Sequence, residues 1–207
     1  GEPDIIFPQF AEYMGSLDSP DRNRKPVLYN EAGTGKYVWK KDIVIDKTFS
    51  EVLDEMVERF PDQYAFKYPT LDYTRTYAQF KRDVDECAAA LISLGVKAGD
   101  HVAVWATNVP QWFITFWATT KIGAVLVTVN TAYKIHEIEY LLKQSDTHTL
   151  VMIEYCKDIN YKEIIRELCP ELEKLEPGKP LYSKNLPFLR NVITVDFSMQ
   201  GCLTWEQ

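Results

Sequence analysis

The sequence predicts an α/β domain in which a largely parallel β-sheet is layered between helices. Short apolar runs lie at 102–106 and 124–129, and a mostly apolar, helix-length segment at 111–122 connects them. Strand, helix and strand in that order form a βαβ unit, whose two strands are parallel. The pattern repeats beyond residue 130, where a second helical pattern precedes a β-branched run at 149–153. Successive units of this kind build a layered α/β domain.

Composition places the chain among ordinary globular proteins. It has 207 residues, of which 46% are hydrophobic and 26% charged, close to average values. The net charge of −7 argues against a general nucleic-acid or membrane-surface binder, because such proteins usually present a basic face. No apolar stretch approaches the roughly 20 residues that cross a bilayer, and no signal-peptide pattern opens the chain. The cysteines lack metal-site spacing, which predicts reduced thiols in a cytoplasmic protein: Cys87, Cys156, Cys169 and Cys202.

Residues 1–46 are the least regular part, and we expect an arm that packs across a main body of residues 47–207. An apolar helix face is expected between Pro8 and Pro20. The run Gly33-Thr34-Gly35 predicts a turn. Phosphate binding there is disfavoured, because the run lacks the spacing of a phosphate-binding loop and follows no predicted strand.

The first clear helix begins after Thr48. Thr48 and Glu51 fit a capping box, in which each side chain binds a free backbone amide of the other residue. Apolar residues then recur at helical spacing as far as Phe60, and a proline follows. Two short runs, 65–68 and 75–77, flank a turn and predict a β-hairpin.

A second capping box, formed by Thr76 and Gln79, predicts the next helix. We expect this helix to end at Gly95 in the left-handed conformation that glycine adopts without strain. Its predicted buried face consists of Phe80, Val84, Cys87, Ala88, Leu91 and Ile92. Beyond residue 130, the patterns predict a helix from 135, a strand at 149–153, a helix at 161–168, a loop at about 171–189, a strand at 192–195 and the start of a helix at 204.

Residues that could carry chemistry are few. The sequence contains no GxGxxG, no phosphate-binding loop, no GxSxG and no HExxH. The three histidines lack ligand spacing and are interpreted as surface or half-buried residues: His101, His136 and His148. The aromatic residues of the 111–122 segment recur at helical spacing, which favours packing over ligand stacking: Trp112, Phe113, Phe116 and Trp117.

Two positions lie where ligands collect in open α/β sheets, at the carboxyl ends of strands. Asn108 and Pro110 form an elbow between strand and helix, and a helix cap is favoured over ligand contact. Lys157 follows the predicted strand at 149–153 and is a candidate ligand-binding cation. The residues alone favour the alternative of a solvated surface lysine.

An ordered series of segments resembles the N-terminal portion of the adenylate-forming enzymes, the AMP-dependent synthetases and ligases. These segments include Leu94-Gly95-Val96-Lys97-Ala98-Gly99-Asp100, Asn108-Val109-Pro110-Gln111-Trp112 and Glu137-Ile138-Glu139-Tyr140-Leu141-Leu142. The resemblance covers residues 47 to 207. Within that family, Leu168-Cys169-Pro170-Glu171-Leu172 is most similar to the medium-chain fatty acyl-CoA synthetases.

The resemblance implies a two-step ligase that uses ATP, Mg²⁺ and coenzyme A (CoA). A carboxylate attacks ATP to give an acyl-adenylate and pyrophosphate, and the CoA thiol then displaces AMP. Related acetyl-CoA synthetases hold a CoA phosphate with basic residues after the corresponding strand, which assigns cofactor binding to Lys157. Asn160 stands where a second basic residue is expected.

The family's phosphate loop and its later catalytic motifs are absent from these residues. The resemblance therefore implies an N-terminal subdomain that is truncated before the phosphate loop, has no catalytic or metal-binding residue of its own and is inactive alone. Its expected partners are the remainder of its own chain, a carboxylic acid, ATP and CoA, with no nucleic acid and with self-association left open. The alternatives are an aryl-acid, long-chain-acid or amino-acid adenylating enzyme and a non-catalytic α/β binding or scaffold module.

Overall fold

A five-stranded parallel sheet forms the centre of the chain in the computed structural model, which describes residues 27–29, 36–38 and 46–207. The strand order is β11-β10-β7-β5-β6, and every neighbouring pair is parallel. The predicted fold class is confirmed. The strands are β5 (His101–Trp105), β6 (Val125–Thr128), β7 (Thr147–Met152), β10 (Asn191–Thr194) and β11 (Leu203–Thr204).

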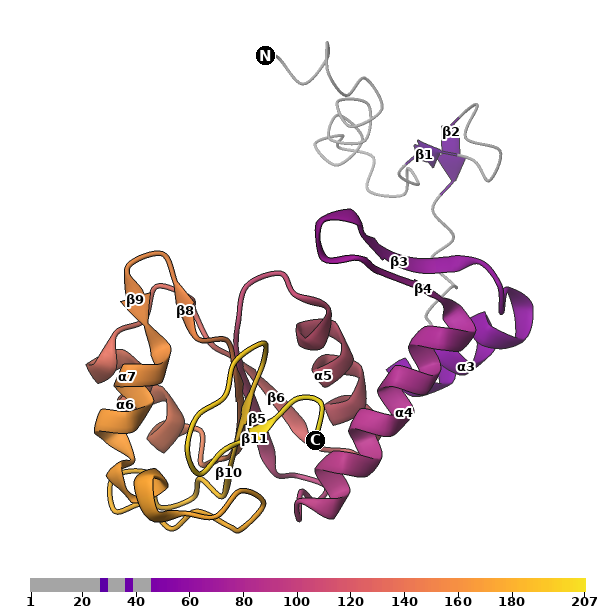
Figure 1. Ribbon diagram of the computed structural model, residues 1–207. Coiled ribbons are helices and arrows are strands. Elements are labelled where there is room, and N and C mark those ends of the chain that lie inside the picture. Colours follow the sequence, from indigo (N-terminus) through magenta and orange to yellow (C-terminus); the bar gives the residue numbers. More distant parts are fainter. Residues whose placement is uncertain (1–26, 30–35, 39–45) are drawn as a thin grey trace, which may run out of the picture. The chain divides into compact units, whose positions relative to one another are not determined.

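Helices cover both faces of this sheet (Figure 1). Successive side chains of a strand point to opposite faces. Val102 and Val104 of β5 accordingly belong to the hydrophobic core on the side of α4 (Tyr77–Ser93) and α5 (Pro110–Lys121). Ala103 and Trp105 belong to the core on the side of α6 (Ile135–Gln144) and α7 (Tyr161–Leu168). All four strand residues are fully buried, as the uncharged runs predict for a sheet covered on both faces.

The chain divides into two units, Gly1–Asp46 and Lys47–Gln207. In the first unit, β1 (Val27–Tyr29) pairs with β2 (Lys36–Val38) in an antiparallel register. The helix expected between residues 8 and 20 and the glycine turn at 33–35 lie outside the described residues.

The two predicted capping boxes are confirmed. Thr48 precedes α3 (Phe49–Arg59), and its hydroxyl accepts from the Glu51 amide at 3.2 Å while the Glu51 carboxylate accepts from the Thr48 amide at 2.7 Å. Thr76 and Gln79 make the same exchange at the start of α4. Between the helices, β3 (Tyr64–Tyr68) and β4 (Tyr73–Thr76) form the predicted antiparallel hairpin around a 3-10 turn, η1 (Pro69–Leu71).

The predicted buried face of α4 is wrong at Ile92, and Cys87 is only partly buried. Phe80, Val84, Ala88 and Leu91 are buried, whereas Ile92 is 58% exposed. The buried residues follow the helical repeat, and Ile92, one residue beyond Leu91, is rotated by about 100° from it toward solvent. Gly95 ends the helix with φ +88°, as expected.

The aromatic residues of α5 pack, but not on the sheet. The buried, sheet-facing positions of this helix are Ile114, Thr115, Ala118 and Thr119. Phe113, Phe116 and Trp117 instead contact aromatic residues of α3, β3 and α4 in edge-on or tilted pairs, with the Phe49 and Phe116 ring centroids 5.1 Å apart. Phe66 and Phe113 are also 5.1 Å apart. These rings are only partly buried, and Phe113 is 37% exposed.

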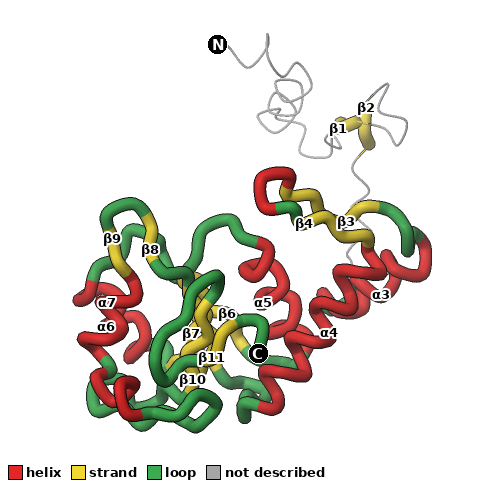
Figure 2. The backbone as a smooth tube through the Cα atoms, viewed as in Figure 1, coloured by secondary structure: helices red, strands yellow, loops and turns green. Residues whose placement is uncertain are grey.

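The chain beyond β7 contains two elements that the sequence patterns did not indicate. A small antiparallel hairpin, β8 (Tyr155–Cys156) and β9 (Ile159–Asn160), precedes α7. Strand β11 lies where the start of a helix was expected, and only a turn follows it within the described residues. Between α7 and β10, a short 3-10 segment η2 (Pro170–Lys174) leads into a long loop (Figure 2). That loop buries Leu181, Leu186 and Leu189 in the core on the α6 and α7 side.

Candidate functional site at the carboxyl edge of the sheet

The strand order places a topological switch point between the carboxyl ends of β5 and β7. From β5 the chain first adds β6 on one side, then crosses over to add β7 on the other side. In open α/β sheets, ligands bind outside the strand ends at such a switch point. The two strands stay paired to their ends, because the Ile153 amide donates to the Trp105 carbonyl at 3.2 Å. Three segments border this edge: the elbow at 106–109, the loop at 129–134 and the β8–β9 hairpin.

Lys157 lies at the tip of the β8–β9 hairpin. It is exposed, and its φ of +55° places it in the left-handed region. Among the residues that the structure describes, no carboxylate forms an ion pair with its ammonium group. Lys157 is therefore an exposed cation at the edge of the sheet where ligands bind in such folds. A phosphate can contact its ammonium group without breaking an existing ion pair.

The elbow interpretation is correct for Pro110 and wrong for Asn108. Pro110 is the first residue of α5, where its missing N–H costs no hydrogen bond. Val109, not Asn108, occupies the capping position, and no side chain caps this helix. Asn108 is exposed at the end of β5. The side-chain amide of Asn108 is therefore accessible to a ligand at the same edge as Lys157. Because the side chain is exposed, packing does not explain why asparagine occurs at this position.

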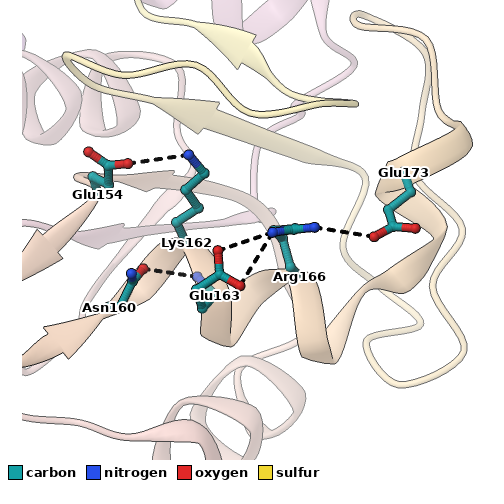
Figure 3. Close-up of polar contacts among 6 residues, drawn as sticks. All are labelled: Glu154, Asn160, Lys162, Glu163, Arg166 and Glu173. Carbon is teal, nitrogen blue, oxygen red and sulfur yellow. Dashed lines mark hydrogen bonds and ion pairs between the residues drawn. The ribbon is translucent and has the colours of Figure 1, made fainter.

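A network of polar contacts fixes the start of α7 (Figure 3). Asn160 caps the helix by accepting from the Glu163 amide at 3.0 Å, so it has a structural role at the position where a second basic residue was expected. Lys162 forms an ion pair with Glu154 at 3.3 Å, and its amide also donates to the Glu154 carbonyl. Arg166 contacts Glu163 at 3.1 Å and Glu173 at 3.4 Å. The basic groups of α7 are therefore neutralised, unlike Lys157.

Two stacked aromatic rings lie directly beneath the edge, and sequence reasoning missed them. Trp105 ends β5 and Tyr161 begins α7, and their ring centroids are 3.7 Å apart with an interplanar angle of 11°. Both side chains are 0% exposed. The Trp105 Nε1–H donates to the Asn130 carbonyl at 3.2 Å, and the Tyr161 hydroxyl donates to the Thr131 carbonyl at 2.7 Å. Burial raises the pKa of Tyr161, as does the neighbouring Cys156 thiol, so its hydroxyl remains a proton donor.

A hollow on the other face lies between α4, α5 and β11, with a volume of about 520 Å³. The Tyr73 hydroxyl and the Arg75 guanidinium both donate to one Asp83 carboxylate oxygen there, at 2.7 and 2.8 Å. Burial and the bond to Asp83 raise the pKa of Tyr73, and burial raises the pKa of Cys87 to about 12. Neither group is a base or nucleophile near neutral pH.

The described residues contain no group of three or more His, Cys, Asp and Glu side chains that could hold a metal ion. Burial lowers the pKa of His148, which contacts the Thr149 hydroxyl at 2.9 Å and so has an ordinary structural environment. All four cysteines are free thiols. None of the helices in the described part combines the length and apolar composition that a bilayer crossing requires.

Comparison with known proteins identifies the family. A family model described as AMP-binding enzyme matches residues 53–195, which include the whole βαβ unit and Lys157. The chain belongs to the AMP-binding enzyme family. The resemblance to adenylate-forming synthetases is thereby confirmed.

Relatives of the chain include named acyl-CoA ligases. "Putative acyl-CoA synthetase YngI" of Bacillus subtilis is 40% identical over 164 residues, covering 79% of this chain and 30% of that protein. A mitochondrial medium-chain acyl-CoA ligase of Bos taurus is 38% identical over 162 residues, covering 78% of this chain and 26% of that protein. The chain thus spans less than a third of the length of either relative.

A solved structure supports the fold of the chain. Acetoacetyl-CoA synthetase from Streptomyces lividans superimposes with a TM-score of 0.61 at 24% identity, covering 77% of this chain and 24% of that one. This likeness extends over most of the chain, so the parallel sheet and its covering helices are an arrangement that a ligase of known structure also has.

Proposed function

We propose that this chain is the N-terminal part of an ATP-dependent acyl-CoA ligase whose substrate is a fatty acid. The acid's carboxylate oxygen bonds to the α-phosphorus of ATP and pyrophosphate leaves, giving the acyl-adenylate. The CoA sulfur then bonds to the acyl carbon, AMP leaves and the thiol proton passes to solvent. The observation that carries this proposal is the identity of 40% and 38% to an acyl-CoA synthetase and a medium-chain acyl-CoA ligase.

The chain's own residues are proposed to build a wall of the active site rather than to perform the chemistry. The described part holds no cluster of His, Cys, Asp and Glu that could bind a metal ion, and we assign it no step that requires Mg²⁺. The phosphate loop and the acid–base groups would come from the remainder of the polypeptide. The two relatives are more than three times as long as the regions of them that the chain matches. Preorganised positioning of ATP and CoA is what such a wall contributes.

Acid-dependent exchange of pyrophosphate into ATP tests this proposal. The full-length ligase is expected to catalyse the exchange with medium-chain fatty acids and less with aryl acids or amino acids. The 207-residue chain alone is expected to show no exchange above buffer. Acid-dependent turnover by the chain alone would overturn its assignment as an inactive part, and a preference for amino acids would replace the proposed substrate class.

Lys157 is proposed to contact a phosphate of CoA. Replacing it in the full-length ligase by glutamate is expected to raise the KM for CoA about ten-fold, because a loss of ~1.4 kcal/mol in one charged contact has that effect. Exchange of pyrophosphate into ATP needs no CoA and serves as the internal reference. Lys179→Glu is the matched control, since Lys179 is also exposed but lies in the loop before β10. Equal KM values for the two variants would remove Lys157 from the site.

The compartment proposed for this ligase is the cytoplasm, in agreement with four thiols that form no disulfide bond. Fractionation of cells followed by immunodetection of the chain tests this assignment. Recovery with mitochondria, the location printed for the bovine relative, would contradict it.

A further inference from the structure

The β8–β9 hairpin that carries Lys157 is too small to fix its own position. Its two strands have two residues each and pair only through Tyr155 with Asn160 and Cys156 with Ile159. An isolated two-stranded hairpin is marginal in water even when it is longer. Its orientation must therefore be set at its base, where the chain enters α7.

Tyr161 forms that base. It follows β9 directly, it is 0% exposed, and the Cys156 thiol of the hairpin lies beside its hydroxyl. The adjacent residue Lys162 closes the hairpin from outside, because its amide donates to the Glu154 carbonyl at 3.2 Å. The ring of Tyr161 stacks on Trp105, the last residue of the central strand. Tyr161 thus joins the hairpin to the sheet through a fully buried side chain, beside Cys156 and Ile159, which pack on the same core.

The same side chain holds a second segment of the edge. The Tyr161 hydroxyl donates to the Thr131 carbonyl, and Trp105 donates to the preceding carbonyl, that of Asn130. The Asn130 side chain completes the turn by accepting from the Ala132 amide at 2.9 Å. The side chains of Trp105 and Tyr161, which stack on each other, therefore bind two consecutive carbonyls of the β6–α6 loop. Tyr161 is also the first residue of α7, the helix that follows the Lys157 hairpin.

We propose that Tyr161 is a positioning residue that holds the Lys157 hairpin and the 130–132 loop as one rigid edge for the incoming CoA. This inference rests on the proposed function of Lys157. Tyr161 touches no substrate in this assignment. It acts by keeping the Lys157 hairpin and the 130–132 loop at a constant distance from each other.

Hydrogen exchange on the 207-residue chain tests whether Tyr161 holds the hairpin and the loop in place. The variant is Tyr161→Phe, which keeps the stacked ring and removes only the hydroxyl. We expect amide exchange to accelerate about five-fold, the effect of one lost hydrogen bond of about 1 kcal/mol, in peptides covering both 129–134 and 155–160. The β3–β4 hairpin serves as the reference for global destabilisation. Tyr155→Phe is the matched control, because Tyr155 lies in the same hairpin but is 61% exposed. Acceleration in only one of the two segments, or equally in both variants, would overturn the inference.

Kinetics of the full-length ligase separate this inference from the proposed function. Tyr161→Phe is expected to raise the KM for CoA several-fold, and in a Lys157→Glu background it is expected to add little, since the two residues act on the same contact. A KM that responds to Lys157→Glu but not to Tyr161→Phe would reject the positioning role and keep the CoA contact. A KM that responds to neither would reject the Lys157 assignment, and the positioning role with it, even where hydrogen exchange shows both segments loosened.

Discussion

Replacement of Gly201 by alanine is expected to destabilise the 207-residue chain by about 2–4 kcal/mol, a cost typical of steric overlap combined with a strained backbone. Gly201 has a φ of +78°, and a Cβ atom there would lie 2.4 Å from the Leu172 carbonyl oxygen and 3.0 Å from the Leu172 Cα atom. Both contacts are backbone atoms of η2, which cannot rotate away as a side chain could. Urea denaturation followed by far-UV circular dichroism measures the free energy of unfolding.

Gly95→Ala separates the cost of backbone strain from the cost of steric overlap. Gly95 has a similar φ of +88°, but no atom lies within 4 Å of the position of its Cβ. This variant is expected to lose only about 1 kcal/mol, the cost of a non-glycine residue in the left-handed region. Equal losses for Gly95→Ala and Gly201→Ala would contradict the close approach of residue 201 to η2.

Leu91→Ala and Ile92→Ala are expected to differ sharply although the residues are adjacent in α4. Leu91 is 1% exposed, so its truncation leaves a cavity in the core and is expected to cost about 2–5 kcal/mol. Ile92 is 58% exposed, and its replacement is expected to change stability by less than about 0.5 kcal/mol, since alanine is also the better helix former. The comparison is made from the midpoints of denaturant unfolding of the two variants, provided that the unfolding free energy depends on denaturant concentration with the same slope in both.

A large loss for Ile92→Ala would show that another part of the protein covers this side of α4 in solution. A small loss for Leu91→Ala would mean that α4 packs against the sheet through a different face.

The sequence was sufficient for the fold wherever local physics decides the outcome. Strand β5 is buried on both faces, so its residues had to be uncharged, and the run 102–106 is visible without any structure. The capping residues Thr48 and Thr76 bind amides within three residues, and their spacing alone identifies them. Helix α4 was predicted correctly as an element, but Ile92 was misplaced because a list of apolar residues does not give the angular width of a contact face.

The candidate site depended on contacts that no local pattern reveals. Lys157 was placed at the carboxyl edge from the order of elements, and the structure puts it there at the tip of a hairpin; its binding role remains a prediction. Trp105 and Tyr161 are 56 positions apart, and each alone resembles an ordinary core aromatic residue. Only the crossover that brings β7 beside β5 joins them. The capping role expected for Asn108 failed because Pro110 sets the start of α5 with Val109 before it.

The central place of β5 has a consequence for how the chain assembles as it leaves the ribosome. Among the described strands of this sheet, β5 is the first to be synthesised, β6 joins one of its sides, and β7, β10 and β11 then extend the other side in chain order. Each new strand therefore adds to an open margin, and none has to insert between two strands that have already paired. Domains commonly fold from the N-terminal side during translation, and this strand order allows the sheet to grow outward as the chain lengthens.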